Sequence, residues 1–280
     1  MIKLLQKCCT LHVAAPDMHQ KACIVGGFAL LAWCLYGAIF ADLEAVYSTP
    51  DAQSYINYAP YRLPVYGFIA NTAGAGIVYL QGAAYVLSCV LLTLATRRIW
   101  PGIILALNLG LVAITFHALT ESFAVLAVCA GLYAHSRRNI PVMVAALVVF
   151  LVLRPMIPLP LASWRMMAEI NAERFAAQVA QCEKYYGHLG ASVWVWRTNI
   201  LNGVYGLSNF AHGGWRVFAM VYNSALWLVF TAGLLRYNWR LVAVVGYLIA
   251  ISGVTHGQGD RVLMVAMPMV IYLVGKRDNG

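Results

Sequence analysis

Residues 51–66 form a short polar stretch between two long apolar segments, and their side chains suit a charged or hydroxylated substrate. Asp51 supplies a carboxylate, and Arg62 supplies a permanent positive charge farther along the same stretch. A deprotonated carboxylate within reach of a hydroxyl group can act as a general base, and a guanidinium group binds phosphate oxygens. The stretch therefore predicts one wall of a catalytic pocket, with Asp51 as the base and Arg62 as a ligand of an anionic group.

Asp51 also has a structural explanation, because it follows Pro50 and fits the start of a short helix that its side chain would cap. The two roles are compatible. Asp42 and Glu44, at the end of the preceding apolar segment, compete for the role of base. We rank them below Asp51, since a hydrophilic collar at a membrane surface accounts for them.

The composition of the whole chain predicts an integral membrane protein. Of the 280 residues, 62% are hydrophobic and 10% are charged, with a mean hydropathy of +0.72, whereas a soluble domain is about a quarter charged. Because lipid offers no hydrogen bonds to the backbone, long apolar runs of this kind form helices. We expect an all-α fold with about eight transmembrane helices, at residues 22–41, 75–95, 100–115, 118–134, 141–162, 217–235, 241–255 and 262–275.

The distribution of charge predicts the orientation of these helices. Basic residues concentrate in alternate short loops, which marks those loops as cytoplasmic. The predicted organisation is a cytoplasmic segment at residues 1–21, one transmembrane domain at 22–277 with external loops at 42–74 and 163–216, and a cytoplasmic tail at 278–280. The net charge of +9 follows from this asymmetry, so we expect membrane lipids and no nucleic acid as partners. The seven cysteines include no spaced pair that would predict a metal site or a disulfide framework.

The second external loop combines charged and apolar residues at helical spacing over residues 164–175, which predicts an amphipathic helix lying on the membrane. Residues 193–197 form an aromatic patch that ends in a basic residue. Two roles remain open for this patch. It suits an aromatic belt at the membrane interface or a wall on which a sugar ring stacks, and we favour the belt.

Four short motifs follow one another along the chain, namely Asp51-x-x-x-Tyr55 with Arg62-Leu-Pro-Val-Tyr66, then Leu119-Thr-Glu-Ser122, then Leu153-Arg-Pro155, and finally residues 259–268 around Arg261. In this order and topology they resemble the polyprenyl-phosphate-sugar-dependent glycosyltransferases of the GT-C superfamily. The resemblance extends over most of the chain. It implies a membrane enzyme that inverts the configuration at the transferred sugar carbon.

The resemblance also implies roles for particular residues. Asp51 would deprotonate the hydroxyl of the acceptor, beside Arg62 and the aromatic side chains of Tyr55 and Tyr66. Glu121 would bind a divalent cation or orient the acceptor. Its alternative role is structural, because an acidic side chain is favourable at a helix N-terminus. No other metal or cofactor site is predicted.

Arg154 and Arg261 would hold the phosphate of the lipid carrier, and neutralising its charge makes it a better leaving group. Arg154 lies within a predicted span, where an ionisable residue usually faces a cavity or a partner. The alternative is that both arginines form internal ion pairs, Arg261 with Asp260 for example.

The sequence thus predicts a glycosyltransferase that moves a sugar from a polyprenyl-phosphate donor to a glycan, lipid or protein acceptor outside the membrane. The compact chain and its basic loops suit a bacterial inner membrane, with the active site facing the periplasm. Two alternatives remain, a transporter or flippase for a lipid-linked or anionic solute and a non-catalytic subunit with the same fold. The absence of an apparent internal repeat counts against the transporter.

Overall fold

The computed structural model describes residues 17–41, 43–47, 64–153, 162–204, 225 and 259–276. Within these ranges the regular structure is helical and no strand is present, which confirms the all-α fold class. The ranges leave out four of the predicted site residues, namely Asp51, Tyr55, Arg62 and Arg154. The stretch from which the chemistry was first inferred therefore lies largely outside the described residues.

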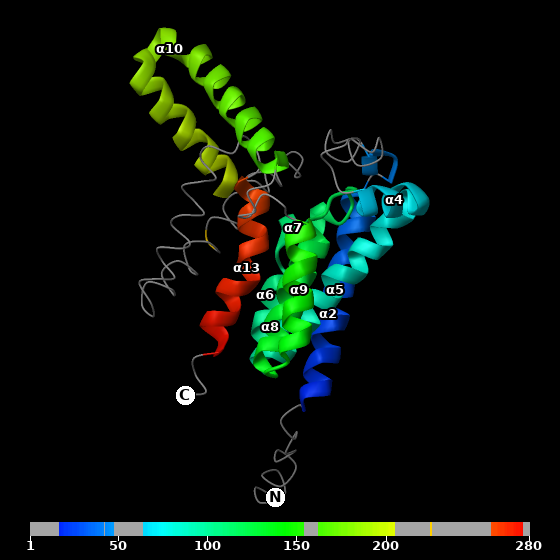
Figure 1. The fold of residues 1–280 in the computed structure, drawn as a ribbon. Helices are drawn as coiled ribbons and strands as arrows, with labels where there is room; N and C mark the ends of the chain where they lie inside the picture. The colour runs from blue at the N-terminus through cyan, green and yellow to red at the C-terminus, as the bar shows by residue number, and fades with distance from the viewer. Residues whose placement is uncertain are drawn as a thin grey trace, which may run out of the picture.

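The main helices are α2 (Met18–Phe40), α4 (Pro64–Ala73), α5 (Ile77–Thr96), α6 (Ile99–Ala106), α7 (Leu109–Ile114), α8 (Glu121–Ser136), α9 (Ile140–Leu153), α10 (Ala162–Val204) and α13 (Gly259–Lys276). Two short 3-10 helices, η1 (Leu43–Tyr47) and η2 (Gly74–Gly76), complete the described elements. Helices α2, α5, α6, α8, α9 and α13 lie side by side as a bundle, and α10 projects from one end of it (Figure 1). Helix α5 packs against α2, α6 and α8, so it forms the centre of the core.

Two tight turns at the opposite end of the bundle contain arginine residues in the left-handed backbone conformation. Arg97 ends α5 with φ of 60°, and Arg138 follows α8 with φ of 56°. Glycine is the usual residue at such positions, because a side chain there costs about 1–2 kcal/mol. A positive charge at a helix C-terminus offsets part of this cost by interacting with the helix dipole.

The bundle core is held by close contacts between small residues and larger side chains. Trp33 of α2 lies over Gly82 of α5, where a Cβ atom would come within 2.6 Å of its ring. The Trp33 ring stacks on Phe116 at a centroid distance of 5.3 Å, and its Nε1 donates a hydrogen bond to Thr115 Oγ1 at 2.9 Å. Glycine at position 82 therefore lets one tryptophan join α2, α5 and the end of α7.

The exterior of the bundle exposes large apolar side chains, and α2 is an example. Helix α2 buries Val25 and Ala29, and it exposes large side chains at Ile24, Leu30, Leu31, Leu35 and Ile39. Such a surface is stable only against lipid or another apolar surface. Two described helical stretches, Met18–Phe40 and Tyr66–Thr96, are long and apolar enough to cross a membrane. Eight such spans stay a prediction.

Three boundaries differ from the expected ones. The helix expected at residues 100–115 is two helices, because the buried Asn108 interrupts it and its side chain accepts a hydrogen bond from Leu111 N at 3.1 Å to cap α7. The helix expected at residues 262–275 begins three residues earlier, at Gly259, so Arg261 lies in the first turn of α13. The segment 42–74, predicted as an external loop, contains η1 and α4.

Substitution of Gly102 tests the packing of α6 on α2 and α5. A Cβ atom at this position would lie 2.0 Å from Thr93 Oγ1, 2.6 Å from Val25 Cγ1 and 2.8 Å from the Cys89 carbonyl oxygen. We expect Gly102→Ala to destabilise the protein by about 1–3 kcal/mol through overpacking. The measurement is the melting temperature in detergent, with Gly27→Ala as control because no atom lies within 4 Å of a Cβ there. Equal melting temperatures would contradict the packing described.

Candidate functional site

The connection between α7 and α8 carries non-helical backbone into the bundle, at residues 115–120. Three hydrogen bonds connect it to other elements. Ala118 N donates to the Val46 carbonyl oxygen at 2.9 Å, the Tyr66 hydroxyl donates to the Leu119 carbonyl oxygen at 3.0 Å, and Gln81 Nε2 donates to the His117 carbonyl oxygen at 2.7 Å. Elements η1, α4 and α5 therefore fix the point at which α8 begins.

Glu121 lies at this point, in the first turn of α8, and its side chain is fully buried. The N-terminus of a helix carries partial positive charge, which stabilises a carboxylate placed there. Its neighbours Thr120 and Ser122 are also fully buried. Among the described residues, Thr120 Oγ1, Ser122 Oγ and Gln81 Oε1 have no hydrogen-bond partner. We call this start of α8, with Thr120, Glu121, Ser122 and the adjoining Gln81, the α8 junction. It has hydrogen-bonding capacity for a further polar group.

Tyr47 joins this end of the bundle to α4 and η2. Its hydroxyl lies 2.7 Å from the Ala70 carbonyl oxygen and 2.6 Å from the Gly74 carbonyl oxygen, so its single hydrogen is shared between these two acceptors. Burial raises the pKa of Tyr47, so the phenol remains protonated and able to donate. The start of α5 is anchored in this way beside the α8 junction.

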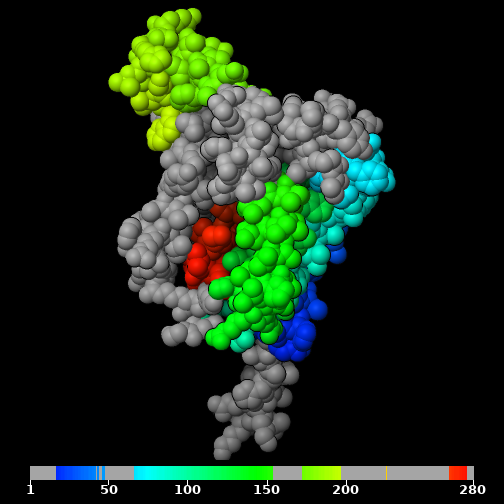
Figure 2. Space-filling view, in the orientation of Figure 1, coloured from blue at the N-terminus to red at the C-terminus, as the bar shows by residue number. Residues whose placement is uncertain are grey.

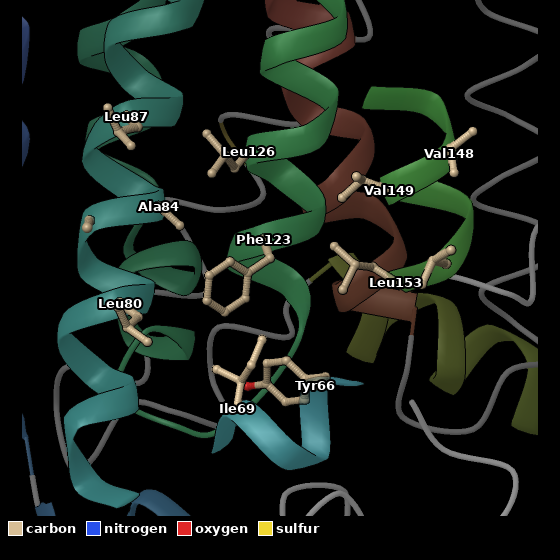
Figure 3. Close-up of a pocket in the computed structure, with 12 residues that line it drawn as sticks. Tyr66, Ile69, Leu80, Ala84, Leu87, Phe123, Leu126, Val148, Val149 and Leu153 are labelled. Carbon is tan, nitrogen blue, oxygen red and sulfur yellow. The ribbon is translucent and has the colours of Figure 1, made fainter. Parts of the chain in front are cut away.

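An apolar groove of about 590 Å³ runs along the flank of the bundle between α4, α5, α8 and α9 (Figure 3). Its lining residues are Tyr66, Ile69, Leu80, Ala83, Ala84, Leu87, Phe123, Leu126, Val148, Val149, Val152 and Leu153. The volume lies within the range of small-molecule binding sites. The only polar atom among these side chains is the Tyr66 hydroxyl, so the groove suits a hydrocarbon chain.

Tyr66 closes one end of the groove, together with Ile69 (Figure 3). Its ring packs edge-on against Phe123 at a centroid distance of 6.0 Å. Its hydroxyl turns to the α8 junction, where it also accepts a hydrogen bond from Gln81 Nε2 at 3.2 Å. A ligand in the groove would therefore meet the ring of Tyr66 rather than its hydroxyl.

Helix α9 forms the outer wall of the groove and packs mainly against α8. Ala146 is its buried residue and faces Gly131 of α8, where a Cβ atom would lie 3.7 Å from that of Ala146. The last residue of the helix, Leu153, lines the groove. The predicted phosphate ligand Arg154 follows Leu153 directly in the sequence.

The structure brings together two of the predicted site residues, Tyr66 and Glu121, through the hydrogen bond from Tyr66 to Leu119. Glu121 does not line the groove and lies in the core behind it. Arg261 lies in the first turn of α13, and its side chain is outside the described atoms. Within the described part of the chain, no three His, Cys, Asp or Glu side chains are grouped as metal ligands.

The sequence prediction missed Gln81, which bonds both to Tyr66 and to the connection before α8. A detectable signal existed, because Gln81 is a polar residue within the apolar segment 75–95, and polar groups in such segments usually have a specific partner. The groove itself has no comparable signal. Its lining consists of ordinary apolar residues from four helices.

The sequence matches no protein-family model and no curated protein, and the chain matches no solved structure. A functional assignment therefore depends on the residues and geometry of this chain. Three features bear on it. They are the apolar groove, the α8 junction with its buried Glu121 at one end of the groove, and the arginines Arg62 and Arg154, which lie near groove residues in the sequence.

Removal of the Tyr66 hydroxyl tests whether it holds the α8 junction. Tyr66→Phe keeps the ring in the groove but leaves the Leu119 carbonyl oxygen without its side-chain donor. We expect a loss of about 1–3 kcal/mol, the cost of a buried polar group without its partner, measured as a lower melting temperature in detergent.

The control is Tyr79→Phe, on the exposed face of α5. A surface substitution of this kind usually changes stability by less than about 0.5 kcal/mol. If both variants melt at the same temperature, the hydroxyl of Tyr66 does not hold the junction.

Proposed function

We propose that the protein is a GT-C-like integral membrane glycosyltransferase with about eight spans. It transfers a sugar, with inversion, from a polyprenyl-phosphate donor to a glycan, lipid or protein acceptor on the external face of the membrane. In this proposal the membrane is a bacterial inner membrane, and the active site faces the periplasm.

The observation that carries the proposal is the apolar groove that ends beside a buried polar junction. A polyprenyl carrier has a long hydrocarbon chain and one charged end. The groove provides apolar contacts for the part of the chain nearest the phosphate, and its Tyr66 end adjoins the N-terminus of α8. A ligand with both properties fits this arrangement better than a soluble metabolite does.

Two predicted phosphate ligands adjoin the groove in the sequence. Arg154 follows the groove residue Leu153, and Arg62 precedes the groove residue Tyr66 by four positions. Leu153 and Tyr66 belong to the same half of the groove, away from Leu87 and Leu126 (Figure 3). This common location supports a single binding site for the charged end of the donor.

In the proposed reaction Asp51 takes the proton of the acceptor hydroxyl as its oxygen attacks the anomeric carbon of the sugar. The bond between that carbon and the carrier phosphate oxygen breaks, and the electron pair leaves with the phosphate. Arg62, Arg154 and Arg261 stabilise the departing negative charge. Glu121 supports the site from behind, either by orienting polar groups or with a divalent cation.

One observation favours a second candidate, a carrier or flippase for a lipid-linked or anionic solute. Transporters often contain helices broken at membrane depth, and Asn108 breaks the α6–α7 segment within the core. In that case Arg154, Arg261 and Asp51 would bind the solute and would catalyse no reaction. A non-catalytic subunit would use neither the base nor the groove.

Replacement of the proposed base separates these functions. We expect Asp51→Asn to lower sugar transfer by about 100-fold or more, the usual contribution of a general base, at unchanged protein level. Surface-glycan mass profiles from cells with wild-type, deleted or substituted protein give the measurement. A deletion that removes a sugar while Asp51→Asn keeps it would rule out Asp51 as the base, and no glycan change on deletion would favour the carrier.

Filling the groove tests the donor site independently of the base. Ala83 is exposed on the groove wall, so Ala83→Trp occupies the groove without entering the core. We expect transfer at low donor concentration to fall by about tenfold or more, equivalent to ~1.4 kcal/mol of lost donor binding. Leu31→Trp, on the exposed face of α2, is the matched control. Equal transfer rates in both variants would exclude the groove as the donor site.

A further inference from the structure

Helix α10 is a helical hairpin that lies at one end of the bundle and contacts α13 (Figure 1). Its two arms meet at Gly187, whose φ of 67° and ψ of 168° interrupt the helix. Val179, Ala191 and Val195 are buried between the arms. Figure 2 shows the apex of this hairpin standing clear of the bundle.

The two arms differ in the chemistry of their exposed surfaces. In the first arm, side chains are described from residue 172. The four charged residues from there to 184 are all exposed: Glu173, Arg174, Glu183 and Lys184. Among the described side chains of the hairpin, the large exposed hydrophobic ones begin at Tyr185 and continue along the second arm. From residue 189 to 196 the second arm contains no acidic or basic residue.

The exposed hydrophobic residues of the second arm lie on one helical face. Leu189, Val193 and Trp196 follow the spacing i, i+4, i+7, which aligns them as a stripe. Their exposed fractions are 78%, 57% and 40%. Ala191 and Val195, which face the first arm, lie on a different side of the helix. The second arm therefore has two apolar faces, and its own hairpin covers one of them.

Aromatic residues with polar ends flank this stripe at the apex. Tyr186 stacks on Trp194 at a centroid distance of 5.3 Å, and Lys184 Nζ lies 4.7 Å from the centre of the Tyr185 ring. Tyrosine, tryptophan and lysine beside aliphatic residues are the combination found where a protein meets the headgroup region of a membrane.

We propose that the stripe of Leu189, Val193 and Trp196 docks on the lipid surface at the end of the bundle from which the hairpin projects. A lipid surface accepts an apolar face without specific donors or acceptors, which matches a stripe that has no charge. The hairpin projects from the bundle, so docking requires it to tilt onto this surface, and its attachment to the bundle keeps the effective concentration of the partner high. This inference rests on the proposal that the bundle spans a membrane.

A second copy of the chain fits the stripe less well. A stable protein interface buries about 800 Å² on each partner, whereas this stripe consists of three side chains on one helix. A glycan also fits less well, because sugar hydroxyls require hydrogen-bonding groups and Leu189 and Val193 have none. The docked arm would lie along the membrane with its charged partner arm facing water.

The test places the photo-crosslinking residue p-benzoylphenylalanine at position 189 of the full chain, in vesicles of phosphatidylethanolamine and phosphatidylglycerol. The matched control has the same residue at position 177, where Ala177 is exposed on the charged arm. After irradiation, mass spectrometry identifies what is attached. We expect phospholipid adducts at position 189, with a yield several-fold above that at position 177.

A second variant, Val193→Glu, places a charge in the middle of the stripe. We expect it to reduce the lipid adduct at position 189 several-fold while the protein keeps its melting temperature, since Val193 is exposed. Crosslinks between two copies of the chain, equal lipid yields at positions 189 and 177, or an adduct that Val193→Glu leaves unchanged would each overturn the proposal. In membranes from expressing cells, a glycan adduct in place of lipid would also overturn it.

Discussion

Hydrogen bonding of the non-helical backbone between α7 and α8 is the constraint on which the candidate site depends. An unsatisfied backbone group in an apolar interior costs several kcal/mol. Residues 115–117 donate to carbonyl oxygens at the end of α7, and Ala118 donates to Val46. Gln81 and Tyr66 then serve the carbonyl oxygens of His117 and Leu119. Because these donors come from other helices, the start of α8 is fixed relative to α4 and α5.

The groove and the acidic junction are consequences of the same constraint. Tyr66 must direct its hydroxyl to Leu119, which leaves its ring to close the groove against Phe123. The α8 helix then presents Phe123 and Leu126 to the groove and Glu121 to the core. One tyrosine thus separates the apolar groove, which meets its ring, from the buried polar side chains at the start of α8, which lie on the side of its hydroxyl.

Among the described residues, the sequence predicted the helical class and the approximate positions of α2, α5, α8, α9 and α13, because membrane-length apolar runs have few other stable structures. It missed the break at Asn108, since one asparagine hardly changes the hydropathy of an apolar run, and only the fold shows that its side chain caps α7. Its motifs included Tyr66 and Glu121, whose role in a site stays a prediction, but not Gln81, which bonds to the same connection. The groove was beyond sequence reasoning, because the chain distance between Tyr66 and Leu153 conceals their common cavity.

Helix α9 packs mainly against α8 and leaves most of its other side chains exposed, which bears on how the groove works. A helix that is apolar on all sides gains little by burying one face against protein rather than lipid, because lipid tails are equally apolar. Its position on α8 therefore depends on side-chain packing along the two helices, in which Gly131 faces Ala146. Since Val148, Val149 and Val152 line the groove from this helix, the width of the groove depends on how α9 packs on α8. The Tyr66 end of the groove is fixed differently, by hydrogen bonds to Leu119 and Gln81.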